Sequence, residues 1–439
     1  TGAVLNQGQL ERNSIFSIVP PTYSDGMVFV GLKDGTVQAF DAVTLKSLWV
    51  YHDPLGGQPN CPITVKDGYL YTGFWNGEAT PANYVCLPIQ DEDPADTAEE
   101  KTAAWTYVHD GGFYWAGAYA GDGFVLVGSD DGFSSSTHKT GRLLRLDAAT
   151  GQLLDSVCGS LGDGRSTVCY DTVSDAYYCT SKGGDFCPAK LGRENGVWKI
   201  TDFSMLRLDN GTAAAPMSTS TPVVYNGRAY VGVSGSAQFG MYSGHNLTVV
   251  DLSGDEMSIA YSVPTQGYPQ TSGILTTAYE DASEYVYVYF LDNYTPGKLR
   301  LLRDHAGQTE ADLLTSETEP KNNKTYETAY ALFTPGGEHG EHAQYAICSP
   351  IVDQYGTLYF KNDSGYLMAF GSVIDHFETT GAAKTEYREG EKFDLGTLKV
   401  EAVYRSGVRR DVTALLTPAD ETMTAGLGSV TLHFGSNQT

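Results

Sequence analysis

The strongest constraint on the fold is a short pattern that recurs seven times: a polar turn, then a strand of alternating β-forming residues. The turns lie at Asp25-Gly26, Asp67-Gly68, Asp122-Gly123, Ser174-Asp175, Asn226-Gly227, Ala282-Ser283-Glu284 and Gln354-Tyr355-Gly356. The strands after them read MVFVG, YLYTG, FVLVG, AYYCT, RAYVG, YVYVY and TLYFK. Polar two-residue turns that lead into strands of period two predict β-hairpins.

A second marker precedes each hairpin, a short segment in which small residues stand beside Pro or Gly. It reads VPP (19–21), NCP (60–62), WAG (115–117), a degenerate RST (165–167), STSTP (218–222), QTSG (270–273) and CSP (348–350). Repeats of about fifty residues with four strands each favour a β-propeller, because radial closure protects the strand edges. We therefore expect an all-β chain with a seven-bladed, alternatively eight-bladed, propeller. The last copy ends at 366–371, one strand short, and residues 3–11 (AVLNQGQLE) are expected to supply that strand.

Composition supports sheets and narrows the function classes. Only 18% of the residues are charged, 50 are Gly and 29 are Tyr, and no window keeps a helical period. The net charge of −25 disfavours nucleic acid as a partner and suits solubility outside cells, or binding of cations or neutral sugars. No stretch approaches the roughly 18–20 apolar residues of a membrane span, so we expect no membrane insertion. The first residues do not resemble a signal peptide, and the chain reads as a mature or trimmed form.

The seven cysteines leave at least one outside any intrachain pair. The absence of a C-x-x-C pattern makes a zinc ribbon or a thioredoxin-like motif unexpected. Residues 166–190 predict three antiparallel strands that bring Cys169, Cys179 and Cys187 near one another, with Cys179 on the opposite face from the other two. We expect small buried strand residues here rather than a disulfide or a metal site.

The segment AFDAVTLKSLW (39–49) makes the repeat type recognisable. It resembles the A-x-D-x-x-T-G-K-x-x-W signature of pyrroloquinoline-quinone (PQQ) repeats, the blades of quinoprotein alcohol dehydrogenase-like propellers. The matching residues are Ala39, Asp41, Thr44, Lys46 and Trp49, and Leu45 stands where the family has Gly. A second copy, RLDAATGQLLD (145–155), keeps Asp147, Thr150 and Gly151 but has Asp155 in place of the Trp. The resemblance spans roughly 20–371 and implies a propeller domain over 1–372.

The dehydrogenases of this family carry eight blades, a disulfide between neighbouring cysteines, calcium ligands and a catalytic Asp. None of those positions transfers onto this chain, which has no adjacent cysteine pair. PQQ and calcium are therefore not expected as cofactors, and the non-enzymatic members that use the propeller as a binding platform are the better analogues.

The tail is a different module. Residues 374–416 resemble the bacterial Ig-like domain of group 3 through Lys384-Thr385, Tyr387, Gly390, Phe393-Asp394, Val400, Tyr404, Gly407 and Val412-Thr413. The resemblance implies a β-sandwich over 373–439, with RSG (405–407) as a hairpin turn, and the sequence stops before the final strand that such domains usually have. Modules of this kind are common spacers in bacterial surface proteins, which implies an extracellular or cell-surface location.

Aromatic residues near the predicted entries to the innermost strands are the candidate ligand contacts. In propellers those entries surround the central channel, where rings and polar groups suit stacking on sugars or docking of a peptide. The candidate ligand-binding residues are Tyr114, Trp115, Arg165, Tyr268, Gln270, His342 and Tyr345. The alternative is ordinary packing between blades.

Other polar motifs carry weaker signals. His339 and His342 in GGEHGEH (336–342) are candidate ligands for a divalent cation, although a solvated loop explains them as well. Ser136 to Lys139 match S-x-x-K only by letters, because the nucleophile chemistry needs a rigid helix start. DEDPAD (91–96) lacks the spacing and Gly of a calcium loop.

These observations favour a non-catalytic binding or scaffold protein of a bacterial surface, a monomer whose channel mouth binds a glycan or a protein. A quinone-dependent oxidoreductase and a carbohydrate-active enzyme on a propeller are the alternatives, since a sequence cannot show two carboxylates at a catalytic separation.

The cofactor expectation is testable by calorimetric titration of the chain with PQQ, with and without calcium. We expect no saturable heat, because no quinone-binding position of the family is present. Saturable binding in about the micromolar range, lost on chelation of calcium, would instead establish a quinoprotein.

Overall fold

The structure, a computed structural model, describes residues 4–13, 19–97, 99–133, 141–158, 162–235, 245–319, 323–419 and 422–434. Within these ranges the helical elements are α1 (Glu280–Ser283) and one 3-10 turn (Thr413–Leu415), and all other regular structure is strand, which confirms the all-β class. No helix in the described ranges is long and apolar enough to cross a membrane. The chain divides into a larger unit, 6–350 with 361–367, and a smaller unit, 1–5 with 351–360 and 368–439.

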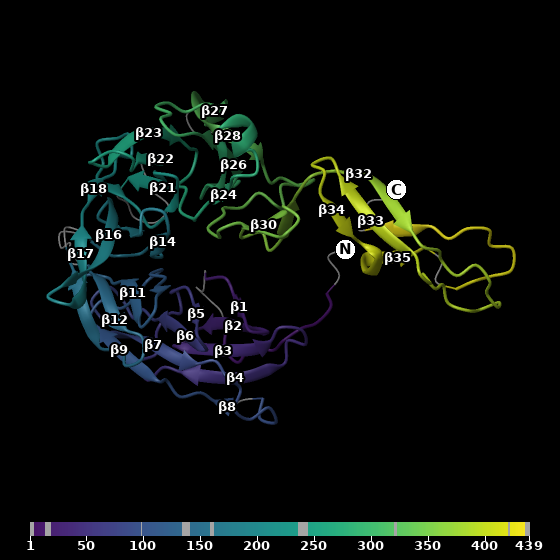
Figure 1. Cartoon of the computed structure of the whole chain (residues 1–439), viewed down its shortest axis with the longest axis horizontal. Coiled ribbons are helices and arrows are strands. Elements are labelled where there is room, and N and C mark those ends of the chain that lie inside the picture. The colour runs from purple at the N-terminus through teal and green to yellow at the C-terminus, as the bar shows by residue number, and fades with distance from the viewer. Residues whose placement is uncertain are drawn as a thin grey trace. The chain divides into compact units, whose positions relative to one another are not determined.

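The larger unit contains six sheets that follow one another along the chain (Figure 1). The first contains β1 (Thr22–Ser24), β2 (Met27–Leu32), β3 (Thr36–Asp41), β4 (Ser47–His52) and β8 (Glu99–Glu100). The second contains β5 (Thr64–Lys66), β6 (Tyr69–Gly73), β7 (Ala82–Pro88) and β9 (Trp105–His109). The third contains β10 (Tyr119–Ala120), β11 (Phe124–Gly128), β12 (Leu143–Asp147) and β13 (Leu153–Val157). Their pairings are antiparallel except for β4 with β8.

The remaining three sheets have five strands each. The fourth contains β14 (Cys169–Asp171), β15 (Ala176–Thr180), β16 (Asp185–Glu194), β17 (Val197–Phe203) and β18 (Leu206–Arg207). The fifth contains β19 (Pro216–Met217), β20 (Val223–Tyr225), β21 (Arg228–Gly235), β22 (His245–Asp251) and β23 (Ser258–Pro264). The sixth contains β24 (Ile274–Thr276), β25 (Val286–Leu291), β26 (Leu299–Asp304), β27 (Leu314–Glu319) and β28 (Lys324–Phe333). In this sixth sheet β26 pairs with β28, while β27 lies at the edge.

The predicted turns lie where the repeat placed them. They join β1 to β2, β5 to β6, β10 to β11, β14 to β15, β20 to β21 and β24 to β25. Asp25 (φ 51°) with Gly26 (φ 76°) and Asn226 (φ 46°) with Gly227 (φ 73°) adopt the two positive φ angles of a type I′ turn. Short polar residues and Gly tolerate this conformation, which explains why the turns carry D-G and N-G.

Neighbouring sheets of the larger unit pack face to face. Successive hydrophobic clusters join the first sheet to the second, the second to the third, and so on to the sixth. Four-stranded meanders stacked in this way are the architecture of a β-propeller, as the repeat predicts. The blade number of seven stays a prediction.

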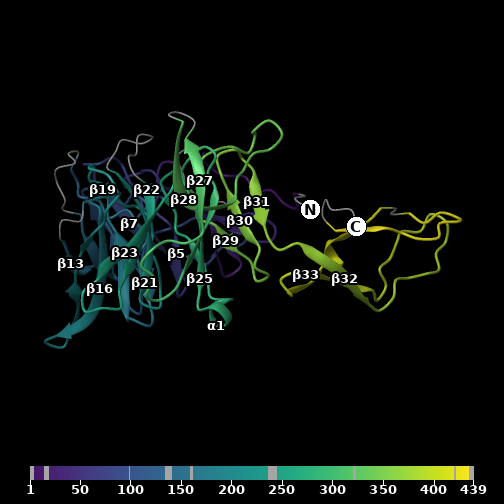
Figure 2. The ribbon, with the colours of Figure 1, turned by 90° about the horizontal axis from the view of Figure 1, so that it is seen from above.

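The strands run between two ends of the larger unit (Figure 2). The hairpin turns from first to second strand and from third to fourth strand emerge at one end, here called the turn end. The connections from second to third strand, and from one sheet to the next, emerge at the other, here called the loop end. Antiparallel meanders impose this separation of the connections. The predicted ligand-binding residues lie in connections between sheets and therefore at the loop end.

The D-x-x-T motif is a capped turn between the third and fourth strands. Asp41 Oδ1 accepts hydrogen bonds from the backbone N–H of Val43 (3.1 Å) and Thr44 (2.7 Å), and Asp147 Oδ1 does the same for Ala149 (3.1 Å) and Thr150 (2.8 Å). The next position has a positive φ in both copies. It is held by Gly151 (φ 70°) in one and by Leu45 (φ 55°) in the other, so the Gly of the family signature serves the backbone.

Buried tryptophans join neighbouring sheets by a hydrogen bond as well as by packing. Trp49 of β4 donates its indole N–H to the carbonyl of Ile89 in the second sheet (3.0 Å). Trp105 of β9 donates in the same way to Ala148 in the third sheet (2.9 Å). The Trp of the repeat is therefore an inter-blade contact.

The smaller unit contains three sheets. β29 (Ile351–Val352), β30 (Leu358–Lys361) and β31 (Leu367–Phe370) form the last copy of the repeat, which has three strands as expected. β32 (Ile374–Thr380), β33 (Lys399–Tyr404) and β34 (Arg409–Asp411) form the second sheet, and β35 (Leu416–Pro418) pairs with β36 (Leu432–Phe434). One core centred on Val400, Ala402 and Val412 includes residues of both. The turn at Gly407 (φ 83°) is confirmed, while the Ig-like assignment and the 372/373 boundary stay predictions.

The expected closing strand at the N-terminus is wrong for the described residues 4–11, none of which lies in a strand. This segment instead follows the first sheet. Asn6 Nδ2 donates to the carbonyl of Val43 (2.7 Å), and the N–H of Glu11 donates to Oε1 of Gln38 in β3 (3.0 Å). The carbonyl of Gln9 also accepts a hydrogen bond from Gln38 Nε2 (3.3 Å).

The cysteine register is also corrected. The three strands form as predicted, but Cys179 is paired directly with Cys187 across β15 and β16, and both belong to one hydrophobic cluster. Cys169 lies opposite Tyr178 and packs into the next cluster, so it is the residue on the other face. Cys179 and Cys187 are buried and Cys169 is partly buried, and all three are free thiols in the structure. Cys179 and Cys187 share a face because residues directly opposite each other in an antiparallel pair point to the same side of the sheet.

The inter-blade role of tryptophan predicts a large loss of stability on Trp49→Ala. The substitution leaves a cavity and the Ile89 carbonyl unpaired, and we expect a loss of about 3–5 kcal/mol in the free energy of unfolding. Trp198→Ala is the matched control, because this side chain in β17 is 49% exposed, and about 1 kcal/mol or less is expected there. Urea unfolding followed by circular dichroism measures both, and equal losses would refute the inter-blade role.

Candidate functional site

The site lies at the loop end of the second, third and fourth sheets. Arg165 comes from the connection between β13 and β14, and Tyr114 from the connection between β9 and β10. Trp75, Asp130 and Lys182 each lie two residues beyond the second strand of their sheets, β6, β11 and β15. Residues far apart in sequence converge here because successive blades present equivalent connections at the same end.

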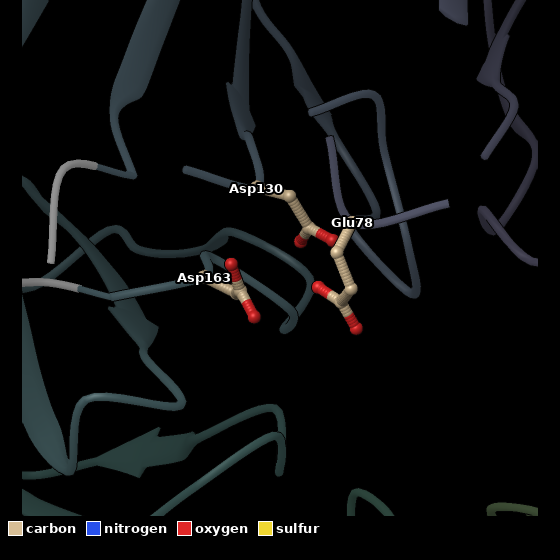
Figure 3. Close-up of side chains that lie close together, drawn as sticks. All are labelled: Glu78, Asp130 and Asp163. Carbon is tan, nitrogen blue, oxygen red and sulfur yellow. The ribbon is translucent and has the colours of Figure 1, made fainter. Parts of the chain in front are cut away.

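The carboxylates of Glu78, Asp130 and Asp163 lie close together (Figure 3), and Arg165 contacts all three. Its Nε donates to Asp130 Oδ1 (3.0 Å) and its Nη2 to Asp130 Oδ2 (2.5 Å), which makes a bidentate pair. The same Nη2 lies 2.8 Å from Glu78 Oε2 and 3.2 Å from Asp163 Oδ2. Lys182 adds a second cation, 3.1 Å from Asp163 Oδ2.

Two aromatic rings lie over the guanidinium. Its carbon is 4.7 Å from the centre of the Tyr114 ring and 6.0 Å from that of Trp75, within the range of cation–π contacts. The rings meet edge to face at 4.8 Å. Trp75 also donates its indole N–H to Asp130 Oδ2 (3.1 Å), so the ring orientation is fixed by the same carboxylate that holds Arg165.

The burial of these groups is graded. Asp130, Asp163 and Arg165 are buried, whereas the rim formed by Trp75, Glu78, Tyr114 and Lys182 is partly exposed. The buried residues Asp130, Asp163 and Arg165 are therefore inaccessible to a ligand, which can contact only the rim.

Burial raises the pKa of Asp130 to about 7, although Arg165 acts in the opposite direction. Burial would also raise the pKa of Asp163, but the charges of Arg165 and Lys182 and the hydrogen bonds it accepts outweigh burial and lower it. The neighbouring carboxylates raise the pKa of the Arg165 guanidinium despite burial, so it is charged throughout. Three carboxylates thus face two cations, and the raised pKa makes Asp130 the carboxylate that gains a proton most readily as the pH falls.

The three carboxylates are residues of a type that can bind a metal ion. Oxygens of Glu78, Asp130 and Asp163 lie within 4.8 Å of one another, the only such group of three His, Cys, Asp or Glu residues within the described ranges. The position that a cation would take is occupied by Arg165 Nη2, which contacts all three. The group as folded therefore holds a guanidinium, and a metal ion would have to displace it.

Of the predicted ligand residues, the structure brings Tyr114, Trp115 and Arg165 together. Trp115 packs beside Tyr114 with the two rings tilted at 45° and their centres 4.5 Å apart, and it has a positive φ of 58°. Its indole N–H is buried and has no hydrogen-bond partner in the described part of the chain. The predicted role of these residues in binding stays a prediction.

Tyr268 and Gln270 lie in the connection between β23 and β24, at the loop end of the fifth and sixth sheets. Tyr268 is 0% exposed, and its hydroxyl accepts the N–H of Thr219 (2.6 Å). Gln270 Oε1 accepts a hydrogen bond from Asn293 Nδ2 (3.1 Å). In this conformation Tyr268 offers no surface for stacking, and its contacts are those of a residue that holds two connections together.

The remaining predicted residues lie in the connection after β28. His342 packs on Tyr366 with ring centres 4.1 Å apart, and the hydrogen bond with Asp363 raises the pKa of Tyr345. His339 has a side chain that is 85% exposed, and the structure gathers no third ligand beside it and His342 in the described ranges. Their role as metal ligands stays a prediction. The Ser136 to Lys139 motif lies outside the described residues.

Sequence reasoning missed Trp75, Glu78, Asp130, Asp163 and Lys182. A signal for three of them exists, because Trp75, Asp130 and Lys182 occupy one equivalent position in successive repeats. Aligning the repeats on the end of the second strand would have found them. Nothing in the sequence marks Glu78 or Asp163 as their neighbours.

Comparison with known proteins adds fold-level similarity only. No family model and no curated protein matches the chain. Among solved structures, BamB from Moraxella catarrhalis is similar at 15% identity and a TM-score of 0.47, over 78% of this chain and 79% of that one. The computationally designed Ika8 protein shows 14% identity and a TM-score of 0.47, over 83% and 98% of the two chains. Quinohemoprotein alcohol dehydrogenase ADHIIG from Pseudomonas putida HK5 shows 12% identity and a TM-score of 0.46, over 77% and 61%.

The raised pKa of Asp130 predicts a specific pH dependence. The folded chain binds this proton more tightly than the unfolded chain, so raising the pH from about 4 to about 7 removes stability through Asp130. Asp130→Asn mimics the protonated form and escapes that loss. Between pH 5 and pH 8 its stability relative to the wild type should improve by about 2 kcal/mol, less than the full shift implies because the neighbours respond.

Asp163→Asn is the control for this prediction. The pKa of Asp163 is lowered, so its carboxylate stabilises the fold wherever it is ionised, and that contribution disappears only as the pH falls below about 4. The variant should be destabilised similarly at pH 5 and pH 8. Thermal unfolding of the three proteins across this range decides the point, and parallel curves for Asp130→Asn and the wild type would refute the assignment of the proton.

Proposed function

We propose that this protein is a non-catalytic binding protein of a bacterial cell surface that binds a neutral glycan. The glycan site is the rim of Trp75, Glu78, Tyr114 and Lys182 at the loop end of the propeller, and the C-terminal module acts as a spacer. The single observation that carries the proposal is the edge-to-face pair of Tyr114 and Trp75 over the buried Arg165, which forms a bidentate pair with Asp130.

The rim suits a sugar ring. Aromatic faces pack against the C–H faces of sugars, and Tyr and Trp provide both an apolar face and a polar edge. Glu78 and Lys182, each about one-third exposed, are placed to exchange hydrogen bonds with hydroxyl groups. Because the ion-pair network beneath holds the rings, little ordering is needed on binding.

Charge favours a neutral ligand over an anionic one. The chain carries −25, and the site itself has three carboxylates for two cations. An acidic polysaccharide would meet repulsion at the site and from the whole molecule.

The same geometry argues against glycoside hydrolysis at this site. Two neighbouring carboxylates with separated pKa values resemble an acid and a nucleophile. However, Asp130 is 0% exposed, both of its oxygens bind Arg165, and Trp75 donates to one of them. A general acid must reach the glycosidic oxygen, and both oxygens of Asp130 are buried and engaged by Arg165 and Trp75.

The surface location rests on the sequence resemblance of the tail to bacterial Ig-like modules and on the acidic composition. A protein ligand at the same rim is the other outcome that the sequence leaves open. The glycan is preferred because the exposed rim is small and centred on two rings, whereas protein interfaces need about 800 Å² from each partner.

Glycan binding is tested by screening the full chain against an array of neutral and acidic bacterial glycans, followed by calorimetry with the best neutral oligosaccharide. Tyr114→Ala should weaken binding at least tenfold, because the stacking face is lost. Tyr23→Ala is the matched control, since Tyr23 in β1 is 69% exposed and lies outside the rim, and it should leave the affinity unchanged.

Three outcomes would contradict the proposal. Absence of binding to any neutral glycan, or equal weakening by both variants, would remove the site. Release of new reducing ends from the bound oligosaccharide would make the protein an enzyme.

A further inference from the structure

A cavity of about 370 Å³ opens at the turn end, between the fifth and sixth sheets. Its walls come from the β20–β21 turn, from α1 and from the residues after β26, and include Tyr225, Arg228, Glu280, Asp281, Glu284 and His305. Figure 2 places α1 next to β25 at the lower edge of the view. The cavity belongs to connections that point away from the glycan rim, so it does not depend on the proposed function.

The floor of the cavity is a buried ion-pair network. Arg228, which is 4% exposed, donates from Nε and Nη2 to the two oxygens of Asp304, each at 3.0 Å. Asp304 also accepts the hydroxyl hydrogens of Tyr230 (2.8 Å) and Tyr261 (2.6 Å). This carboxylate is saturated with donors, and it neutralises the only lining residue with a permanent positive charge.

One group of the floor is left unsatisfied. Nη1 of Arg228 is buried and has no hydrogen-bond partner among the described residues. Its nearest carboxylate is that of Asp251, at 3.7 Å, close enough for attraction but too far for a hydrogen bond. A buried donor without an acceptor costs about 1–3 kcal/mol, so an acceptor that reached this N–H from the cavity would be stabilised by it.

The rim has the opposite character. Glu280, Asp281 and Glu284 bring three carboxylates to the mouth, and the Tyr225 hydroxyl donates to Glu280 Oε2 (2.6 Å) and fixes its position. With Arg228 already paired to Asp304, the mouth has an excess of negative charge. A bare anion is therefore repelled at the entrance, although Arg228 Nη1 is a donor that lacks an acceptor among the described residues.

We infer that this cavity binds a basic residue of a peptide, whose cationic side chain lies among the rim carboxylates while a backbone carbonyl accepts from Arg228 Nη1. A lysine or arginine residue carries both groups on one short unit. The volume lies at the lower end of the range for small-ligand sites and suits one residue rather than a folded surface. An amino sugar offers the charge too, but its hydroxyl groups are weaker acceptors than an amide carbonyl.

The inference is tested on the full chain by calorimetry and by NMR titration with acetyl-Gly-Lys-Gly-amide. The norleucine peptide keeps the backbone and loses the charge, and n-butylamine keeps the charge and loses the carbonyl. Both should bind at least tenfold more weakly than the lysine peptide. Glucosamine is included to separate an amino sugar from a peptide.

The site variant is Glu280→Gln with Asp281→Asn, which removes two rim charges and leaves the buried floor intact. It should weaken the lysine peptide at least tenfold without changing the unfolding midpoint. The charge-matched control is Asp255→Asn with Glu256→Gln, two exposed residues of the β22–β23 turn at the same end that do not line the cavity. It should leave the affinity within about twofold.

Several results would overturn the inference. Equal affinity for the lysine and norleucine peptides would show that the carboxylates are not used. Equal weakening by the site and control variants would reduce the effect to overall charge. Glucosamine that binds as tightly as the peptide would assign the cavity to amino sugars, and no binding by any probe would leave no site.

Discussion

Face-to-face packing of successive sheets is the interaction on which the rest of this structure depends. A four-stranded meander has two apolar faces and can bury neither alone, so each sheet needs a neighbour on both sides. The clusters between consecutive sheets of the larger unit meet that need, and Trp49 and Trp105 add a hydrogen bond to the next sheet. Once the sheets stack in this way, their connections necessarily gather at two ends, and both candidate sites are consequences of that gathering.

The Arg165 network joins neighbouring sheets at the loop end, as hydrophobic packing joins them along their faces. It links a loop of the second sheet through Glu78, one of the third through Asp130, and one of the fourth through Lys182. Buried ion pairs seldom add much net stability, because removing each charge from water is costly. These ion pairs define the geometry of the site, since each donor has few alternative acceptors. A rigid aromatic rim on such a base recognises a ligand with little loss of conformational freedom.

The repeat made most of the fold predictable. The hairpin turns, the three-stranded last copy and the RSG turn were all identifiable from local patterns, because turn chemistry and period-two alternation act over a few residues. Two predictions were wrong because they depend on contacts that local sequence patterns do not determine. The faces of the cysteines depended on the register between β15 and β16, and the N-terminal segment follows β3 through side-chain contacts that no periodicity encodes. The site was half predictable for the same reason: Tyr114 and Arg165 stand in marked connections, whereas Glu78 and Asp163 are ordinary loop residues until the fold brings them together.

The equivalent position at the end of the second strand shows how a repeat fold leaves room for function. In successive sheets it holds Trp75, Asp130 and Lys182, an aromatic, an acid and a base. The residues that build the blades are constrained by packing and by turn geometry, as the positive φ of Leu45 and Gly151 illustrates. At the position just beyond the strand the backbone is held by hydrogen bonds to connections between sheets, but the side chain lies outside the regular strands. Each blade can therefore place a different chemical group there without altering the scaffold, and neighbouring blades bring those groups within contact. A composite site built in this way is invisible in any one repeat and is defined only by the order of the repeats around the propeller.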